Sequence, residues 1–287
     1  MRSSESLFFD IRGLRYHVRH WRGDAARRMI LLHGWMDVSA SFQFLVDALR
    51  PEWDVYAPDW RGYGLSQWAG ADSYWFPDYM GDLDALLDRI QPGAPVNLVG
   101  HSLGGNVAGL FAGVRPARVA KFVNLEGFGM RATKPEQAVK RYAGWLDELR
   151  EKPRWRPYAS FGELADRLQR NNARLTRERA EFLAQHWGEQ AGEGVILRSD
   201  PAHKLMNATL SRLEETIACW NQVTAPVLWV DASDSEVLKR IGITPQEHAE
   251  RRNAFRDLRY VTVPDAGHML HHDQPERVAR LIEEFLG

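Results

Sequence analysis

Short, largely apolar runs alternate with amphipathic segments along most of this chain. Such runs are typical of strands buried within a sheet, and they occur at residues 29–32, 54–58, 95–99, 120–125, 226–230 and 259–263. Apolar residues at helical spacing are found between them, at residues 42–49, 79–90, 106–112 and 275–286. Residues 7–21 alternate in polarity around Arg12-Gly13, which predicts an N-terminal β-hairpin. Strands that alternate with helices predict an α/β fold with a mostly parallel central sheet flanked by helices.

This alternation stops between residues 128 and 222. The stretch is polar, rich in Arg and Glu, and has no convincing strand, whereas residues 137–149 and 161–168 have helical periodicity. It is too long to be a loop in a compact domain. We therefore expect a core made of residues 1–127 and 223–287, with an inserted helical cap at residues 128–222.

Composition narrows the class of protein. The chain has 287 residues, 44% of them hydrophobic, which is enough for a substantial core. A formal net charge of −1 gives no indication of a nucleic acid or an anionic membrane as a partner. The N-terminus lacks the apolar stretch of a signal peptide, and no apolar run reaches the ~20 residues that cross a bilayer. The single cysteine, Cys219, suits a reducing compartment. We expect a cytoplasmic protein that acts on a small molecule. Its oligomeric state cannot be inferred from these patterns.

The strongest chemical signal is the pentapeptide Gly100-His101-Ser102-Leu103-Gly104. It fits the G-x-S-x-G nucleophile elbow, a strained turn from a strand to a helix that exposes a serine hydroxyl. An apolar strand-like run precedes it and a helical pattern follows it, in the order that the motif requires. Ser102 is therefore the candidate nucleophile.

Several motifs together resemble the α/β-hydrolase superfamily, in particular its capped serine hydrolases. The motifs that carry the resemblance are His33-Gly34-Trp35, the stretch from Asp59 to Ser66, Gly100 to Gly105, and Asp265-Ala266-Gly267-His268. The resemblance covers about residues 1–127 and 223–287. It implies an α/β-hydrolase fold with a cap inserted after the sixth strand, and the chain order nucleophile, acid, histidine.

His268 is the candidate base. It follows a predicted strand and Gly267 and precedes the last helix, which is where the base lies in the family. An imidazole with a pKa near ~6.5 can take the serine proton and return it to a leaving group. His271 and His272 are competitors that would each require the loop to shift, and His101 is interpreted as structural. No HExxH pattern is present, and we expect neither a metal nor a cofactor.

The acid is the least defined member of the proposed triad. Most family members place it after the seventh strand, where Asp234 is the first candidate here. Ala232 stands where glycine is common in the family, and the aspartate comes one residue early. Some members carry the acid at the end of the sixth strand, which makes Glu126 the alternative, and Asp231 ranks third. Whichever residue is the acid, its role is to orient His268 and to stabilise the imidazolium.

Acyl chemistry also requires hydrogen-bond donors for an oxyanion. Leu103 offers its backbone N–H at the start of the predicted helix, and the resemblance assigns a second donor to the backbone N–H of Trp35. Two such donors stabilise charge that appears only in the transition state. The stretch from Asp59 to Ser66 is interpreted as a turn scaffold anchored by Asp59 and Arg61.

The leading interpretation is a serine hydrolase that acts on an ester or related acyl bond of a small, apolar substrate through an acyl-enzyme. Carboxylesterase is the first candidate, and thioesterases and carbon–carbon bond hydrolases use the same apparatus. One alternative is a cofactor-independent dioxygenase of N-heteroaromatic rings, a class that shares this fold and carries its acid after the sixth strand. The other is a non-catalytic ligand receptor on the hydrolase scaffold.

Overall fold

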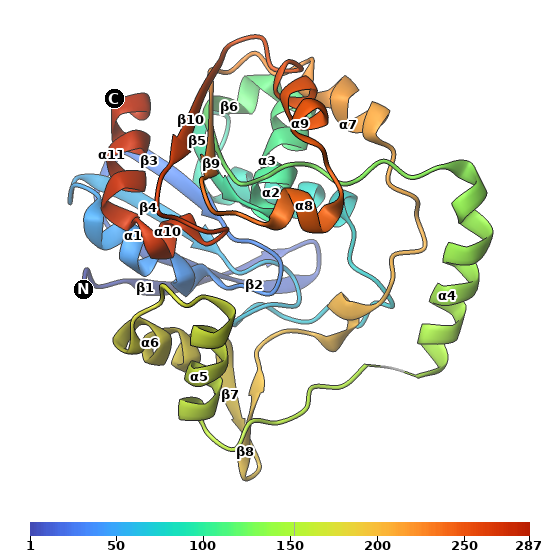
Figure 1. Cartoon of the computed structure of the whole chain (residues 1–287). Coiled ribbons are helices and arrows are strands. Elements are labelled where there is room, and N and C mark those ends of the chain that lie inside the picture. The colour runs from blue at the N-terminus through green and yellow to red at the C-terminus, as the bar shows by residue number, and fades with distance from the viewer. Residues whose placement is uncertain (152) are drawn as a thin grey trace.

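An eight-stranded sheet forms the centre of the computed structural model, which describes residues 1–151 and 153–287 (Figure 1). Neighbouring strands follow the order β1-β2-β4-β3-β5-β6-β9-β10. β2 pairs antiparallel with β1 and with β4, and all the other neighbours are parallel, so the predicted hairpin and parallel sheet are confirmed. The strands are β1 (Glu5–Ile11), β2 (Leu14–Trp21), β3 (Asp24–Leu32), β4 (Trp53–Pro58), β5 (Val96–His101), β6 (Val119–Leu125), β9 (Val227–Ala232) and β10 (Leu258–Val263).

Helices cover both faces of this sheet, as the alternating pattern predicts. The helices of the chain are α1 (Gln43–Ala48), α2 (Phe76–Ile90), α3 (Leu103–Val114), α4 (Ala138–Arg150), α5 (Phe161–Asn171), α6 (Arg177–Trp187), α7 (Leu213–Trp220), α8 (Val237–Ile241), α9 (Pro245–Arg252), α10 (Leu270–Asp273) and α11 (Pro275–Leu286). Short 3-10 turns lie at η1 (Ser39–Phe42), η2 (Pro116–Arg118), η3 (Pro135–Gln137) and η4 (Pro201–Lys204). Within the described ranges, no helix combines the length and the apolar composition needed to cross a membrane.

Successive residues of the central strands belong to two different cores. In β3, Ile30 and Leu32 pack with residues of α2 and α3, whereas Met29 and Leu31 pack with residues of α1 and α11. This division follows from the two-residue repeat of a strand, which points neighbouring side chains to opposite faces. A continuous apolar run is therefore required wherever both faces are covered, which explains the runs in the sequence.

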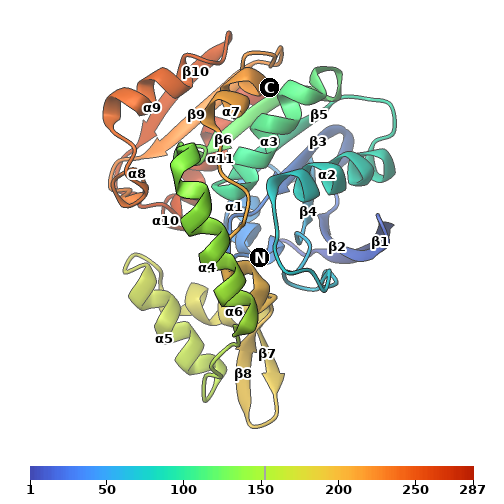
Figure 2. The same ribbon diagram turned by 90° about the vertical axis from the view of Figure 1, so that its right-hand side faces the viewer.

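The proposed cap lies between β6 and β9 and contains two strands that the sequence pattern did not predict. β7 (Gly188–Ala191) and β8 (Gly194–Leu197) form an antiparallel hairpin. Together with α5 and α6 it lies below the sheet (Figure 1 and Figure 2). Apolar residues of α5, α6 and β8 form a small separate core that also contains Phe44 of α1. Four-residue strands are too short to give a clear alternating pattern, which is why the segment was expected to be wholly helical.

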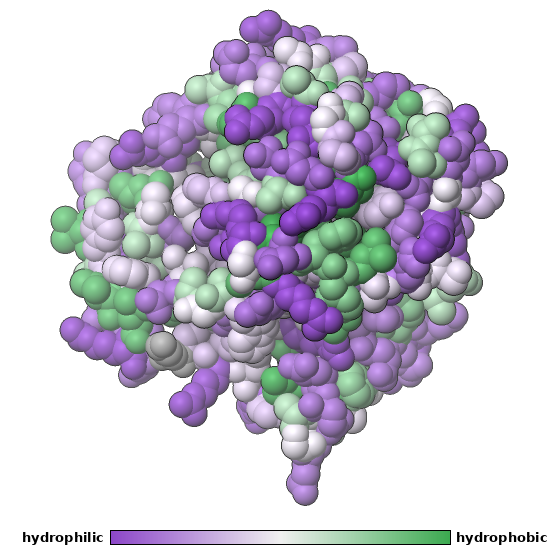
Figure 3. Space-filling view, turned by 180° about the vertical axis from the view of Figure 1, so that it is seen from behind, coloured by the Kyte–Doolittle hydropathy of each residue, from purple (hydrophilic) through white to green (hydrophobic). Residues whose placement is uncertain are grey.

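Helix α4 stands apart from the rest of the cap (Figure 1). None of its residues is buried. Val139, Tyr142 and Leu146 are each at least half exposed. The space-filling view from behind shows apolar residues gathered along the edge of the molecule that α4 forms (Figure 3). Its contacts to the chain near η4 include a hydrogen bond from Arg141 to the carbonyl of Asn207.

Candidate active site

Ser102 occupies the sharp turn between β5 and α3. Its φ of 52° and ψ of −113° lie outside the regions that L-residues favour, which is typical of a nucleophile elbow. Two glycines make the turn sterically feasible. A Cβ atom on Gly100 would lie 2.5 Å from the carbonyl carbon of Gly104, and a Cβ on Gly104 would lie 2.1 Å from the carbonyl oxygen of Leu32. The turn therefore tolerates no side chain at either position.

Three side chains form a continuous line of contacts at this turn. The Oγ atom of Ser102 lies 3.1 Å from Nε2 of His268, and Nδ1 of the same imidazole lies 3.1 Å from Oε2 of Glu126. Ser102 follows β5, Glu126 follows β6, and His268 lies in the loop between β10 and α10. Because β5, β6, β9 and β10 are neighbours in the parallel part of the sheet, their carboxyl ends bring these three loops together.

Glu126 is held in place by two further hydrogen bonds. Its side chain is fully buried, Oε1 accepts a hydrogen bond of 2.7 Å from the backbone N–H of Ala232, and Oε2 accepts one from the hydroxyl of Ser235. Its φ of 57° is in the left-handed region. The carboxylate is thus aimed at His268 by the backbone turn and by donors from the loop after β9.

Burial shifts the pKa values of Glu126 and His268 in opposite directions. It raises the pKa of Glu126 to about 7, because the charged carboxylate loses its hydration. It lowers the pKa of His268 to about 4 for the same reason, and the positive charge of Arg240 acts in the same direction. A neutral imidazole beside a serine hydroxyl is the protonation state that a general base requires.

The structure does not bring Asp234, the first candidate for the acid, to His268. The carboxylate of Asp234 is about half exposed and pairs with Arg174, in the loop between α5 and α6. Its other oxygen accepts a hydrogen bond from the hydroxyl of Ser233. Glu126, the alternative, takes the place beside the imidazole. Asp234 instead links the proposed cap to the core.

Asp231, the third candidate, is also turned away from His268. It accepts hydrogen bonds of 2.8 Å from the indole of Trp229 and from the hydroxyl of Tyr260. Burial raises the pKa of Asp231 to about 6, and the neighbouring Glu126 acts in the same direction. Its partners lie on β9, β10 and α9, where His248 and Arg252 are within 3.7 Å of Oδ2, and no contact to His268 is present in the described structure.

The neighbouring histidines lie behind the base. His101 is buried, and its Nε2 donates a hydrogen bond of 2.8 Å to the backbone carbonyl of His268. His272 contacts the hydroxyl of Ser41, 2.6 Å away. Neither His271 nor His272 contacts Ser102 in the described structure, so the loop presents only His268 to the hydroxyl.

Two backbone segments lie close to Ser102. Leu103 is the first residue of α3, so its N–H is one of the helix N-terminal donors without an intrahelical acceptor. The backbone of Gly34 passes close to the elbow, since a Cβ on it would lie 3.3 Å from Cβ of Ser102. The adjacent residue Trp35 is 56% exposed, and its indole donates to the carbonyl of His203.

The stretch from Asp59 to Ser66 forms a buried turn next to the site. The carboxylate of Asp59 accepts hydrogen bonds from the backbone of Ser39 and Leu65 and lies 2.7 Å from Nδ1 of His17. Arg61 makes a two-pronged contact with the buried carboxylate of Asp82. These partners agree with the scaffold interpretation of Asp59 and Arg61.

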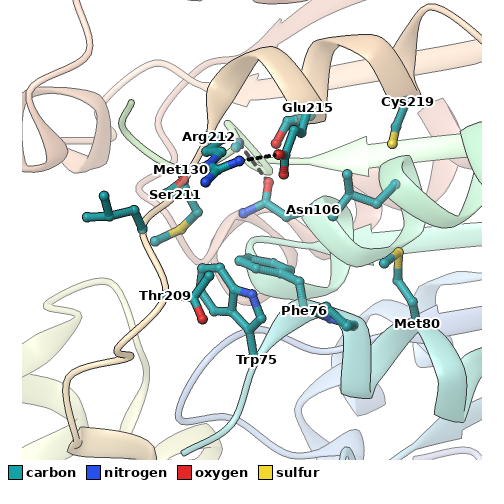
Figure 4. A pocket seen from close by; sticks show the side chains of 15 residues that line it. Trp75, Phe76, Met80, Asn106, Met130, Thr209, Ser211, Arg212, Glu215 and Cys219 are labelled. Carbon is teal, nitrogen blue, oxygen red and sulfur yellow. Dashed lines mark hydrogen bonds and ion pairs between the residues drawn. The ribbon is translucent and has the colours of Figure 1, made fainter. Parts of the chain in front are cut away.

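A cavity of about 190 Å³ lies between α2, α3 and α7, next to the elbow helix (Figure 4). Trp75, Phe76 and Met130 give it apolar walls, and Asn106 of α3 lies one turn beyond Ser102. The Oδ1 atom of Asn106 accepts a hydrogen bond of 2.7 Å from the backbone of Gly129. Thr209, Ser211, Arg212 and Glu215 add polar groups to the lining, and none of Ser102, Glu126 and His268 lines this cavity.

Two residues of the site lacked a sequence signal. Ser235 donates to Glu126 from a loop, and Asn106 follows the elbow by one helical turn. Serine and asparagine are common in loops and at helix starts, so residue type alone gives no signal. Only the location of Ser235 near the end of β9, and of Asn106 near the elbow, could have pointed to them.

Comparisons with known proteins agree with this fold. A family model described as "Alpha/beta hydrolase family" matches residues 29–281. The chain is similar to the serine hydrolase-like protein of Danio rerio, with 27% identity over 275 residues, covering 93% of this chain and 83% of that protein. It is also similar to the sn-1-specific diacylglycerol lipase ABHD11 of Mus musculus, with 27% identity over 292 residues, covering 99% and 89%. Among solved structures, a thioesterase domain from the curacin biosynthetic pathway has a TM-score of 0.88 and 23% identity, covering 98% of this chain and 99% of that one. This last likeness concerns the fold.

Proposed function

Because this chain belongs to the alpha/beta hydrolase family, we propose that it is a serine hydrolase in which Ser102 attacks an ester or a related acyl carbon. The observation that carries the proposal is the line of contacts from Ser102 through His268 to Glu126. A nucleophile, a base within hydrogen-bond reach and a group that orients the base are the parts that such catalysis needs.

The first half of the reaction forms an acyl-enzyme. His268 Nε2 takes the proton of the Ser102 hydroxyl as Oγ adds to the acyl carbon, which gives a tetrahedral oxyanion. The imidazolium then gives this proton to the leaving group as the bond to it breaks. In the second half, His268 takes a proton from water as the water oxygen adds to the acyl carbon. The imidazolium then returns this proton to Oγ of Ser102 as the acyl–oxygen bond breaks and the acid product leaves.

Glu126 is the proposed acid of this triad. Its carboxylate accepts a hydrogen bond from Nδ1–H of His268, which selects the tautomer with a free lone pair on Nε2. As the imidazole becomes positive, the buried negative charge next to it stabilises the cation. The carboxylate does not itself take the proton.

The proposed oxyanion donors are the backbone N–H groups of Leu103 and Trp35. The first lies at the N-terminus of α3, where the helix dipole also favours negative charge. The second comes from the loop after β3, where a Cβ atom on Gly34 would lie 3.3 Å from Cβ of Ser102. Each donor of this kind contributes about 3 kcal/mol to transition-state stabilisation.

The proposed substrate is a small molecule with an apolar acyl or alcohol part. The cavity lined by Trp75, Phe76 and Met130 supports this, because its walls are mainly apolar and it adjoins the elbow helix (Figure 4). The relatives include a protein named as a diacylglycerol lipase, which also supports an ester with apolar chains. Carboxylesterase chemistry is the first candidate.

Covalent labelling with a fluorophosphonate tests the proposal. The probe reacts with activated serines, so wild-type protein should gain one adduct, mapped by mass spectrometry to the peptide that contains Ser102. The variant Ser102→Ala should gain none and should lose turnover of a small p-nitrophenyl ester. Labelling elsewhere, or equal ester turnover by the variant, contradicts the proposal.

A cofactor-independent dioxygenase is the second candidate, and the contact between Glu126 and His268 favours it. That class carries its acid after the sixth strand and uses the histidine to deprotonate an N-heteroaromatic substrate. Oxygen uptake with a hydroxyquinolone-type substrate, together with an unlabelled Ser102, would support it over ester hydrolysis.

A further inference from the structure

Three buried side chains converge behind the proposed catalytic base. Asp37, His101 and His271 each offer one potential ligand atom, and these three atoms all lie within 4.8 Å of one another. No other cluster of this kind is present among residues 1–151 and 153–287. Each of the three residues is at most 2% exposed, so bulk water does not solvate the cluster.

An unpartnered polar atom is present on every member of this cluster. Nδ1 of His101, Nδ1 of His271 and Oδ2 of Asp37 have no hydrogen-bond partner in the described structure. An unsatisfied buried polar atom costs about 1–3 kcal/mol. One such atom on each of three neighbouring buried side chains is unusual, because nearly all buried polar groups in native proteins are paired.

The tautomer of His101 leaves a lone pair at its unpartnered nitrogen. Nε2 of His101 lies 2.8 Å from the carbonyl oxygen of His268, and a carbonyl only accepts, so Nε2 carries the proton. Nδ1 is then unprotonated, and its lone pair can bind a cation. A ligating imidazole whose other nitrogen donates to a backbone carbonyl is the usual arrangement in metal sites.

Asp37 has a carboxylate without a described counter-charge. One oxygen accepts a hydrogen bond of 2.8 Å from the backbone N–H of Val38, and no ion pair to Asp37 is present among the described residues. A cation bound at Oδ2 would compensate the charge that burial disfavours.

We propose that Asp37, His101 and His271 bind a divalent transition-metal ion, with Zn²⁺ as the best match to two imidazole nitrogens and one carboxylate oxygen. This site was not expected from the sequence, since its ligands are 64 and 170 positions apart (37 to 101 and 101 to 271) and form no motif. A buried water is the other occupant with suitable chemistry, but it adds no positive charge next to Asp37.

The three ligands come from the three segments that hold the proposed catalytic groups. Asp37 lies two residues after Trp35, His101 directly precedes Ser102, and His271 lies three residues after His268. An ion that joins them would fix these segments relative to one another without touching the reacting atoms. It is therefore a positioning site, and its existence does not depend on the proposed serine chemistry.

Metal titration of the whole chain tests this proposal. Protein stripped with a chelator should bind one equivalent of Zn²⁺, gain several degrees in melting temperature, and show visible absorption when Co²⁺ replaces zinc. Asp37→Asn preserves shape but removes the anionic ligand, so it should weaken Zn²⁺ binding at least about tenfold and lose the gain in melting temperature. His248→Gln, at a buried histidine outside the cluster, should bind Zn²⁺ as wild type does.

Measurements on wild-type protein alone keep the proposal falsifiable if Asp37→Asn does not fold. Crystals soaked in zinc should give an anomalous peak between the three ligand atoms. A water without anomalous signal there, no Co²⁺ absorption, or equal Zn²⁺ affinity in a folded Asp37→Asn variant would each overturn it.

Discussion

Nδ1 of His268 lies 3.1 Å from Oε2 of Glu126, although 142 positions separate the two residues in the chain. The carboxylate is fully buried, and the imidazole is one-quarter exposed. The contact therefore joins the carboxylate of Glu126, which water cannot reach, to the imidazole of His268, which a substrate can reach. It is the feature that most directly connects the fold to the proposed chemistry.

Neutralising Glu126 should reduce catalysis far more than neutralising Asp234. Glu126→Gln keeps the shape but removes the charge that orients and stabilises the imidazolium, so we expect kcat to fall about 10³–10⁴-fold. Asp234→Asn breaks only a half-exposed ion pair with Arg174 and should change kcat by less than about threefold. Ester turnover of the two purified variants, compared at equal folded concentration, checks this. Similar small losses in both would exclude Glu126 as the acid.

The pH dependence of kcat/KM should reflect the coupled titration of Glu126 and His268. Burial raises the pKa of Glu126 to about 7 and lowers the pKa of His268 to about 4, and two interacting groups take up protons as a pair. Catalysis requires an ionised Glu126 carboxylate next to a neutral His268 imidazole. This state is lost when the pair takes up its first proton. We therefore expect kcat/KM to fall as the pH drops through about 7.

The same reasoning predicts a shifted profile in Glu126→Gln. Only the imidazole of His268 then titrates, so the acid limb of the residual activity should move down toward pH 4. Profiles of kcat/KM over about pH 4–9 measure both limbs. An acid limb at the same pH in the variant and in wild type would contradict the pairing.

Removing the charge of Asp82 should destabilise the protein without touching the triad. This fully buried carboxylate holds the guanidinium of Arg61 with contacts of 2.5 and 2.6 Å. Asp82→Asn leaves that cation without its main partner, so we expect a loss of about 3–5 kcal/mol in the free energy of unfolding. The matched control Asp88→Asn breaks an exposed pair with Arg118 and should cost at most about 1 kcal/mol. Urea denaturation measures both, and equal losses would contradict the scaffold role.

Narrowing the cavity beside α3 should select against long substrates. Leu110 lines this cavity, and Leu110→Phe places additional bulk inside it. We expect kcat/KM to fall at least about tenfold for a long-chain ester and little for an acetate ester. Val114 lies one turn further along the same helix and is 48% exposed, so Val114→Phe is the control and should affect neither. Equal losses of kcat/KM with both esters would contradict a role of the cavity in substrate binding.

The sequence predicted the sheet and the elbow because both depend on local patterns. A strand covered on both faces must be continuously apolar, and β3, β5 and β6 occur where such runs were seen. The elbow needs two glycines at fixed positions, since Gly100 and Gly104 meet backbone atoms directly. Constraints of this kind are visible in a single sequence.

The choice between Asp234 and Glu126 depends on a relationship that no local pattern contains. Both follow a strand, and the usual place of the acid in the family favoured Asp234. In the structure, Arg174 of the proposed cap pairs with Asp234, and Ser235 and Ala232 hold Glu126 instead. Those partners come from segments far apart in the chain, so burial and pairing decide the outcome. The hairpin β7–β8 was missed for a different reason, since its strands are too short to show alternation.

The backbone conformation of Ser102 places stability and activity in opposition. A non-glycine residue in so rare a region of φ and ψ stores about 1–3 kcal/mol. Ser102→Gly would release most of it, at a cost of about 0.4–1 kcal/mol in extra freedom of the unfolded chain. An evolution experiment that rewards heat resistance alone would therefore favour loss of the reactive hydroxyl. Any directed improvement of this protein has to select for turnover at every round.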